Sequence, residues 1–98
     1  MPSDQDNPLA LLELGKHYWL PVYKPRELVL DHGKGARVWD TRGRDYIDFG
    51  AGIAVNALGH QDPDLLAALL AQAGKLWHAS NVFYTEPPLR LAGELVKA

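Results

Sequence analysis

Residues 27–49 read ELVLDHGKGARVWDTRGRDYIDF, and this stretch decides the fold of the chain. Three runs rich in β-prone residues, 27–32, 36–40 and 45–49, are separated by short segments that contain glycine. These segments are Gly33-Lys34-Gly35 and Thr41-Arg42-Gly43-Arg44, and both have the length of hairpin connections. The stretch therefore predicts a three-stranded antiparallel meander.

The next stretch, residues 48–63, reads DFGAGIAVNALGHQDP. Glycines such as Gly50, Gly52 and Gly59 are unusual in a core strand, and so many apolar residues are unusual in a loop. Either the backbone bends sharply here or another group approaches it closely. The spacing leaves both interpretations open. A dinucleotide-binding loop is not indicated, because Val55 stands where its third glycine would be.

Three further segments carry helix signals. Asparagine-proline and aspartate-proline pairs begin two of them, and a threonine shortly before two prolines begins the third. Leucines recur at helical spacing in each segment. Glycine is expected to end the first helix, whereas the second should end near a tryptophan. The predicted helices start after Asn7, Asp62 and Thr85, and the first two end at Gly15 and near Trp77.

The composition describes a small globular domain. The 98 residues are 47% hydrophobic and 22% charged, and the net charge of −2 offers no electrostatic footprint for nucleic acid or an anionic membrane. Because there is no cysteine, disulfides and thiolate metal sites are excluded. No apolar run reaches the roughly 18 residues of a membrane span. The polar start does not resemble a signal peptide, so we expect a cytoplasmic protein.

Few side chains suggest chemistry by themselves. His60, Asp62 and Asp64 lie within five residues, but a metal site needs three or four converging ligands. Helix capping explains the aspartates, and a hydrogen bond in the preceding turn is the favoured role of the histidine. Loop aromatics such as Tyr23 and Phe83 are candidates for lining a site, although simple packing explains them equally well. None of the five lysines has the context of a nucleophile.

Five stretches occur in an order and spacing that together are specific. They are VYKP (22–25), GKGARVWDTRGRDYIDF (33–49), GIAVNALGHQDP (52–63), KLWHASNVFYTEP (75–87) and LRLAGELV (89–96). In this order they resemble the amino-terminal portion of class III aminotransferases, and among these the acetylornithine and succinylornithine aminotransferases. The resemblance covers residues 18–98.

The resemblance implies an α+β fragment of an α/β, pyridoxal-phosphate-dependent transferase of fold type I. The fragment would contain an N-terminal helix, the three-stranded antiparallel meander and two helices. The polar residues 1–7 are expected to form a flexible tail, and residues 8–86 would form the N-terminal part of the small domain. Residues 87–98 would start the first helix of a truncated large domain. The family works as a homodimer and transfers an amino group from an N-acylated ornithine to 2-oxoglutarate.

The resemblance also implies the cofactor, pyridoxal 5'-phosphate. The family's phosphate-binding turn, its aspartate and its Schiff-base lysine all match positions after Ala98, so the isolated chain is expected to be inactive. The last predicted helix has an unfinished apolar stripe, which likewise predicts a fragment. Two alternatives remain open: a non-catalytic α+β interaction module that retains part of that fold, and an independent domain with an accidental likeness.

Four residues match substrate-site positions of the family. Tyr23 and Ile53 match positions that line the substrate pocket, and Ala54 lies beside Ile53 in the same wall. Phe83 matches an aromatic residue that reaches the active site of the neighbouring subunit. The positions expected to shape the turn before the helix are Asn56, Gly59 and His60.

Overall fold

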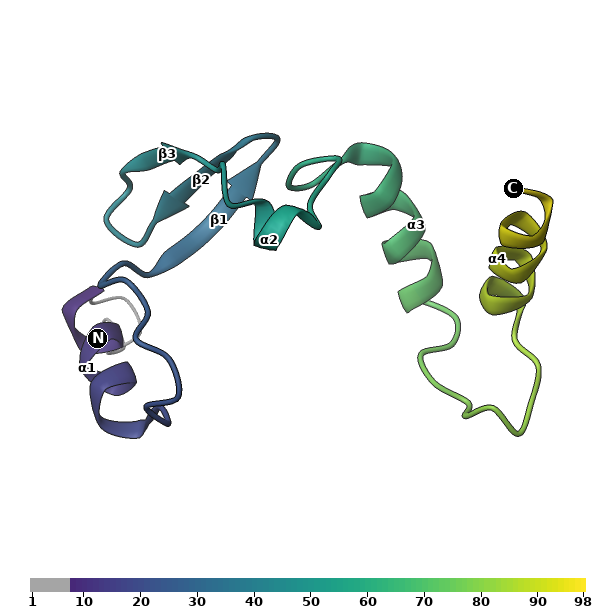
Figure 1. The fold of residues 1–98 in the computed structure, drawn as a ribbon, viewed down its shortest axis with the longest axis horizontal. Helices are drawn as coiled ribbons and strands as arrows, with labels where there is room; N and C mark the ends of the chain where they lie inside the picture. Colours follow the sequence, from purple (N-terminus) through teal and green to yellow (C-terminus); the bar gives the residue numbers. More distant parts are fainter. Residues whose placement is uncertain (1–7) are drawn as a thin grey trace. The chain divides into compact units, whose positions relative to one another are not determined.

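The computed structural model describes residues 8–98 (Figure 1). Its elements are α1 (Pro8–Tyr18), β1 (Leu30–Lys34), β2 (Arg37–Asp40), β3 (Asp45–Ile47), α2 (Ala51–Ala54), α3 (Pro63–Ala73) and α4 (Glu86–Lys97). Local contacts divide the chain into one unit that ends at Asp62 and a second, Pro63–Ala98. The predicted tail, residues 1–7, and the predicted cap Asn7 lie outside the described residues. Among residues 8–98, no helix is both long and apolar enough to cross a membrane.

The sheet confirms the predicted meander. Its strand order is β1-β2-β3, and both neighbouring pairs are antiparallel (Figure 1). Gly33 pairs with Val38 within the β1–β2 ladder, and Val38 pairs with Tyr46 on the other side. The first strand begins and ends later than predicted, so Gly33 lies inside β1 and the turn falls at Gly35-Ala36. Gly35 has φ +57°, which suits a glycine at that turn.

The buried centre of the described residues is small and lies on β2. Val38 is 7% exposed and is the buried hydrophobic residue of this part of the chain, while Asp40 is 3% exposed. The Asp40 carboxylate accepts hydrogen bonds from the Arg42 and Arg44 amides, from the Arg44 guanidinium and from the Tyr46 hydroxyl. Burial alone would raise the pKa of Asp40, but these donors favour the carboxylate and lower its pKa to about 2. This one side chain therefore ties the β2–β3 turn to both strands.

Two helix ends differ from the predictions. Gly15 was expected to end α1, but the helix continues to Tyr18, and the Trp19 amide donates to the Gly15 carbonyl over 3.2 Å. A glycine commonly ends a helix by adopting a left-handed conformation, and no positive φ is found at Gly15. The three residues that follow Gly15, residues 16–18, therefore still belong to α1.

The second unit contains α3 and α4. The predicted end of α3 near Trp77 is wrong, because the helix ends at Ala73, directly before Gly74. The Trp77 indole nitrogen donates to the Ala73 carbonyl over 2.7 Å, so this ring satisfies an otherwise open carbonyl at the helix end. Thr85 is the N-cap of α4, as predicted, although its side chain makes no capping hydrogen bond.

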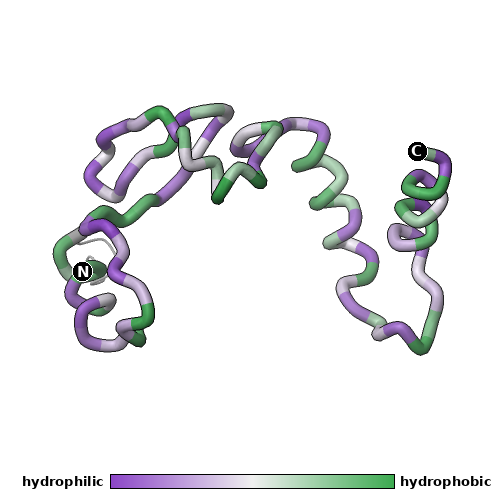
Figure 2. Tube along the Cα trace, in the orientation of Figure 1, coloured by the Kyte–Doolittle hydropathy of each residue, from purple (hydrophilic) through white to green (hydrophobic). Residues whose placement is uncertain are grey.

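The helices carry apolar surface that the described residues leave uncovered. Among the elements that the structure describes, only the strand pairs β1–β2 and β2–β3 pack together, both in the first unit, and α3 and α4 contain no buried residue. Leu69 of α3 is 67% exposed and Leu95 of α4 is 66% exposed. Figure 2 shows the hydrophobic residues that run along α3. These helices therefore gain little stability from packing inside the described residues.

Candidate functional site

The turn α2 follows directly after the sheet and has a left-handed backbone. Ala51, Gly52, Ile53 and Ala54 have φ values of 47°, 60°, 65° and 64°. The amides of Ile53 and Ala54 both donate to the Gly50 carbonyl, over 2.9 and 3.0 Å. Each non-glycine residue in this conformation costs roughly 1–2 kcal/mol. The glycine-rich stretch is thus a sharp bend at α2, which appears as a hydrophobic run in Figure 2.

The carboxylate of Asp48 joins this turn to the next segment. Its Oδ1 accepts a hydrogen bond from the Ala51 amide at 2.9 Å, and its Oδ2 lies 2.8 Å from Nε2 of His60. The two side chains are 20% and 28% exposed. The hydrogen bond with His60, followed by that from the Ala51 amide, lowers the pKa of Asp48. Sequence reasoning missed Asp48, because its partner His60 lies twelve residues away and no local pattern marks the pair.

His60 is fixed on the β1–β2 hairpin. The Gly35 amide donates to the His60 carbonyl over 2.8 Å, and the His60 amide donates to the Gly35 carbonyl over 2.9 Å. A Cβ on Gly33 would lie 2.6 Å from Cγ of the His60 ring, and a Cβ on Gly59 would lie 2.8 Å from the Gly35 oxygen. Close approach therefore does occur, and the protein's own chain makes it. These contacts agree with the structural roles predicted for Gly59 and His60.

A metal site at the histidine is not indicated. Within residues 8–98, no group of three or more His, Cys, Asp or Glu side chains could hold a metal ion. His60 has Asp48 as its hydrogen-bond partner instead, so it does form a hydrogen bond, but the partner lies twelve residues away and not in the preceding turn.

Three of the four predicted substrate-site residues lie in the first unit. Ile53 is 94% exposed and lies beside Ala54, which is also exposed, so α2 presents both side chains together. Tyr23 is 81% exposed and lines a cavity of about 650 Å³ between α1 and the loop that follows it. The structure therefore groups Ile53 with Ala54 on α2 and places Tyr23 on a separate loop.

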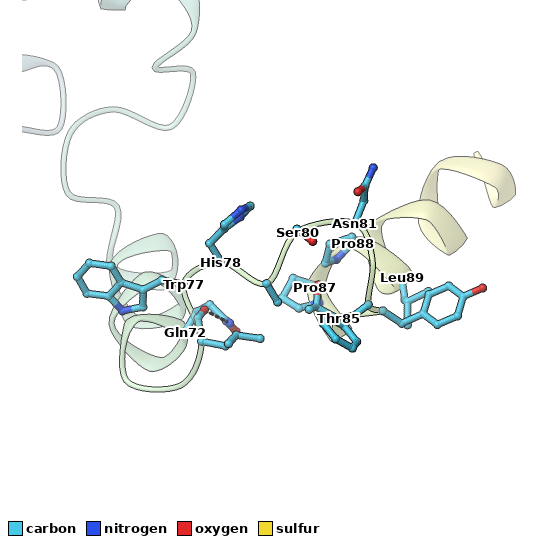
Figure 3. A pocket seen from close by; sticks show the side chains of 13 residues that line it. Gln72, Trp77, His78, Ser80, Asn81, Thr85, Pro87, Pro88 and Leu89 are labelled. Carbon is cyan, nitrogen blue, oxygen red and sulfur yellow. Dashed lines mark hydrogen bonds between the residues drawn. The ribbon is translucent and has the colours of Figure 1, made fainter.

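Phe83, the fourth predicted residue, lies in the second unit. It is 69% exposed and lines a cavity of about 670 Å³ between the end of α3 and the start of α4. Figure 3 shows His78 and Asn81 projecting to the same side of the connecting loop. Ser80 has φ +59°, and its Oγ accepts a hydrogen bond from the Val82 amide over 3.2 Å. This hydrogen bond is local to the loop and lies directly before Phe83.

The described residues do not by themselves fit pyridoxal 5'-phosphate. The cofactor needs a lysine shielded from water beside a cradle for its phosphate. All five lysines have exposed side chains, and none of them lines the cavity around Phe83. Lys16 lies 3.7 Å from Glu13 and 3.6 Å from Glu27, which are ordinary surface ion pairs.

Comparisons with known proteins identify the family to which the chain is similar. A family model described as "Aminotransferase class-III" matches residues 21–98. The acetylornithine aminotransferase of Xanthomonas campestris is 60% identical over 98 residues, which make up 100% of this chain and 23% of that protein.

Two solved structures are similar to the chain. The N-acetylornithine aminotransferase from Stenotrophomonas maltophilia K279a aligns with a TM-score of 0.78 and 62% identity, covering 89% of this chain and 22% of that one. The ornithine aminotransferase from Toxoplasma gondii, described with partial occupancy of PLP at its active site, aligns with a TM-score of 0.80 and 33% identity. That match covers 92% of this chain and 22% of the other. The chain thus spans less than a quarter of the length of each of these relatives.

Proposed function

Because the chain belongs to the class III aminotransferase family, as its ordered motifs predict, we propose that it forms part of an N-acetylornithine aminotransferase. In this proposal 2-oxoglutarate accepts the amino group, and succinylornithine is the alternative donor. The enzyme works as a homodimer in the cytoplasm. The observation that carries the proposal is the 60% identity over the whole chain to the Xanthomonas campestris enzyme.

The chain's own residues would contribute to substrate binding. Exposed apolar and aromatic side chains suit this role, because substrate pockets are lined mainly by such groups with a few polar atoms. Ile53 and Ala54 would form one wall of the pocket, and the Tyr23 ring would supply a second surface with a hydroxyl. Phe83 would reach the active site of the neighbouring subunit. All four side chains are exposed in the described residues, so they are available for such contacts.

Pyridoxal 5'-phosphate would be held by other parts of the enzyme. When bound, this cofactor supplies an electron sink for chemistry at the α-carbon of amino acids. Since no lysine in residues 8–98 is shielded, the proposal assigns the covalent site to the part of the relatives that this chain does not cover. The 98-residue chain alone should then neither bind the cofactor covalently nor transfer an amino group.

A chimaera tests this proposal. It joins these 98 residues to the remainder of the Xanthomonas campestris relative, replacing the matching 23% of that protein. We expect transfer of the amino group from N-acetylornithine to 2-oxoglutarate, together with the absorbance band of the protein-bound cofactor. Neither is expected from the 98-residue chain alone or from the remainder alone.

Two results would contradict the proposal at different levels. A soluble chimaera that fails to bind the cofactor, although the intact relative binds it, would favour the non-catalytic interaction module. A chimaera that binds the cofactor but accepts only amino donors other than the acylated ornithines would overturn the substrate assignment. Sedimentation of the active chimaera should give a dimer.

A further inference from the structure

We propose that Asp48 is a positioning residue for the substrate pocket, because its carboxylate holds the left-handed turn α2 in place and so fixes Ile53 and Ala54. The inference rests on the proposed function, which assigns these two side chains to the wall of that pocket. Asp48 itself would not touch the substrate. It would act on binding through the backbone of the turn.

The turn needs an external restraint. Three of its four residues, Ala51, Ile53 and Ala54, carry side chains at positive φ, where only glycine is unstrained. Such conformations persist only when surrounding contacts hold them, and they gather at ligand-binding sites. The turn's own restraints are backbone hydrogen bonds. The Gly50 carbonyl accepts from two amides of the turn, and the Ala51 carbonyl accepts from the Asn56 amide over 2.9 Å.

Asp48 connects the turn to a fixed frame. Its own amide donates to the Ala36 carbonyl over 2.8 Å, at the β1–β2 hairpin. Its side chain bonds to His60, whose backbone exchanges two hydrogen bonds with Gly35 of the same hairpin. The second oxygen of Asp48 then accepts the Ala51 amide at the first residue of the turn. One carboxylate therefore bridges the hairpin, the His60 segment and the strained turn.

The conformation of the turn decides in which direction the side chains of Ile53 and Ala54 point. Inversion of φ at Ile53 or Ala54 swings the Cβ to a different direction, so a relaxed turn would present a different wall to the substrate. With alanine at position 51, where φ is 47°, the turn keeps its strained geometry only while the amide of that residue is held by Asp48. Loss of the carboxylate should therefore weaken substrate binding without removing the sheet.

The first test reads the backbone and is independent of activity. In the isotope-labelled 98-residue chain, a strong intraresidue nuclear Overhauser effect between amide and α protons reports a positive φ. We expect this signal at Ile53 and Ala54 in the parent and its loss in Asp48→Ala. The matched control is Asp45→Ala on β3, which removes an exposed carboxylate that lies 2.6 Å from the guanidinium of Arg37 on β2 and should leave the turn unchanged.

The second test uses the chimaera with the Xanthomonas campestris remainder. Asp48→Ala should raise the Michaelis constant for N-acetylornithine roughly ten- to hundredfold, the size expected when a distant change misplaces a binding group. The absorbance of the bound cofactor should be unchanged. Adding Ala51→Gly, which removes the strain at φ 47°, should restore most of the loss in the Asp48→Ala background.

The outcomes are separable. A turn that keeps positive φ in Asp48→Ala, or an unchanged Michaelis constant in an active chimaera, would overturn the positioning role. The positioning role would also be overturned if Asp48→Ala removed the cross-strand signals of the whole sheet and Ala51→Gly did not restore them. Asp48 would then be a general structural residue. A parent chimaera without bound cofactor would count against the proposed function, while the nuclear magnetic resonance comparison would still decide the role of Asp48 in the turn.

Discussion

Substitution of Gly59 by alanine tests the close approach that organises the first unit. Gly59 has φ +80°, and a Cβ built there would lie 2.8 Å from the oxygen of Gly35 and 3.0 Å from its carbonyl carbon. The obstructing atoms belong to the backbone, so no side-chain rotation can relieve the overlap. The β1–β2 hairpin and the segment that carries His60 would have to separate.

The magnitude has two parts. A side chain at positive φ costs roughly 1–2 kcal/mol at any such position. Separation also breaks the two hydrogen bonds that Gly35 and His60 exchange, 2.8 and 2.9 Å long, and each contributes about 1 kcal/mol. The Gly59→Ala change should therefore cost about 3–4 kcal/mol. Gly43 provides a matched control, because its φ is +83° but a Cβ at this position would have nothing within 4 Å, so only the first part applies.

Hydrogen exchange at the Gly35 and His60 amides provides the assay. The second part, about 2 kcal/mol, corresponds to a factor of about thirty in the equilibrium of local opening. Protection of these amides should fall at least that much further in Gly59→Ala than in Gly43→Ala. Equal protection in the two variants would refute the reasoning, because it would show that backbone strain alone explains the need for Gly59.

Three further predictions concern other parts of the chain. The pKa of Asp40 is lowered from 3.8 to about 2, so the stability from this carboxylate is complete above about pH 4 and is lost as the pH falls towards 2; urea titrations should show an acid step that is absent from Asp40→Asn. In Gly33→Ala the new Cβ would lie 2.6 Å from Cγ of His60 and displace its ring, which should lower the free energy of unfolding by roughly 1–3 kcal/mol; an unchanged urea midpoint would contradict this. Tyr23→Ala and Phe83→Ala should each lower kcat/KM of the chimaera roughly tenfold. In the 98-residue chain, where both rings are exposed, the two changes should leave the thermal midpoint unchanged; a lower midpoint would indicate packing instead.

The sequence determined the elements that depend on neighbouring residues. Short β-prone runs separated by glycine turns predicted the antiparallel meander, and the structure confirms its order. Thr85 before two prolines predicted the start of α4. The predicted helix ends at Gly15 and Trp77 were wrong in opposite directions. The backbone stays helical through Gly15, so α1 continues to Tyr18, whereas α3 ends at Ala73, directly before Gly74. The family also followed from sequence, because five motifs in one order are specific even though each is weak.

Only the tertiary structure decided what the glycines of residues 48–63 do. The sequence left bending and close approach open, and both occur: Gly52 lies in the left-handed turn, while Gly59 bends and touches Gly35. The role of Asp48 became visible only with His60 beside it. The physical reason is the separation along the sequence of the residues that interact. Turn and helix preferences arise among residues a few positions apart, whereas steric limits on a Cβ and the partners of a carboxylate depend on segments that folding brings together.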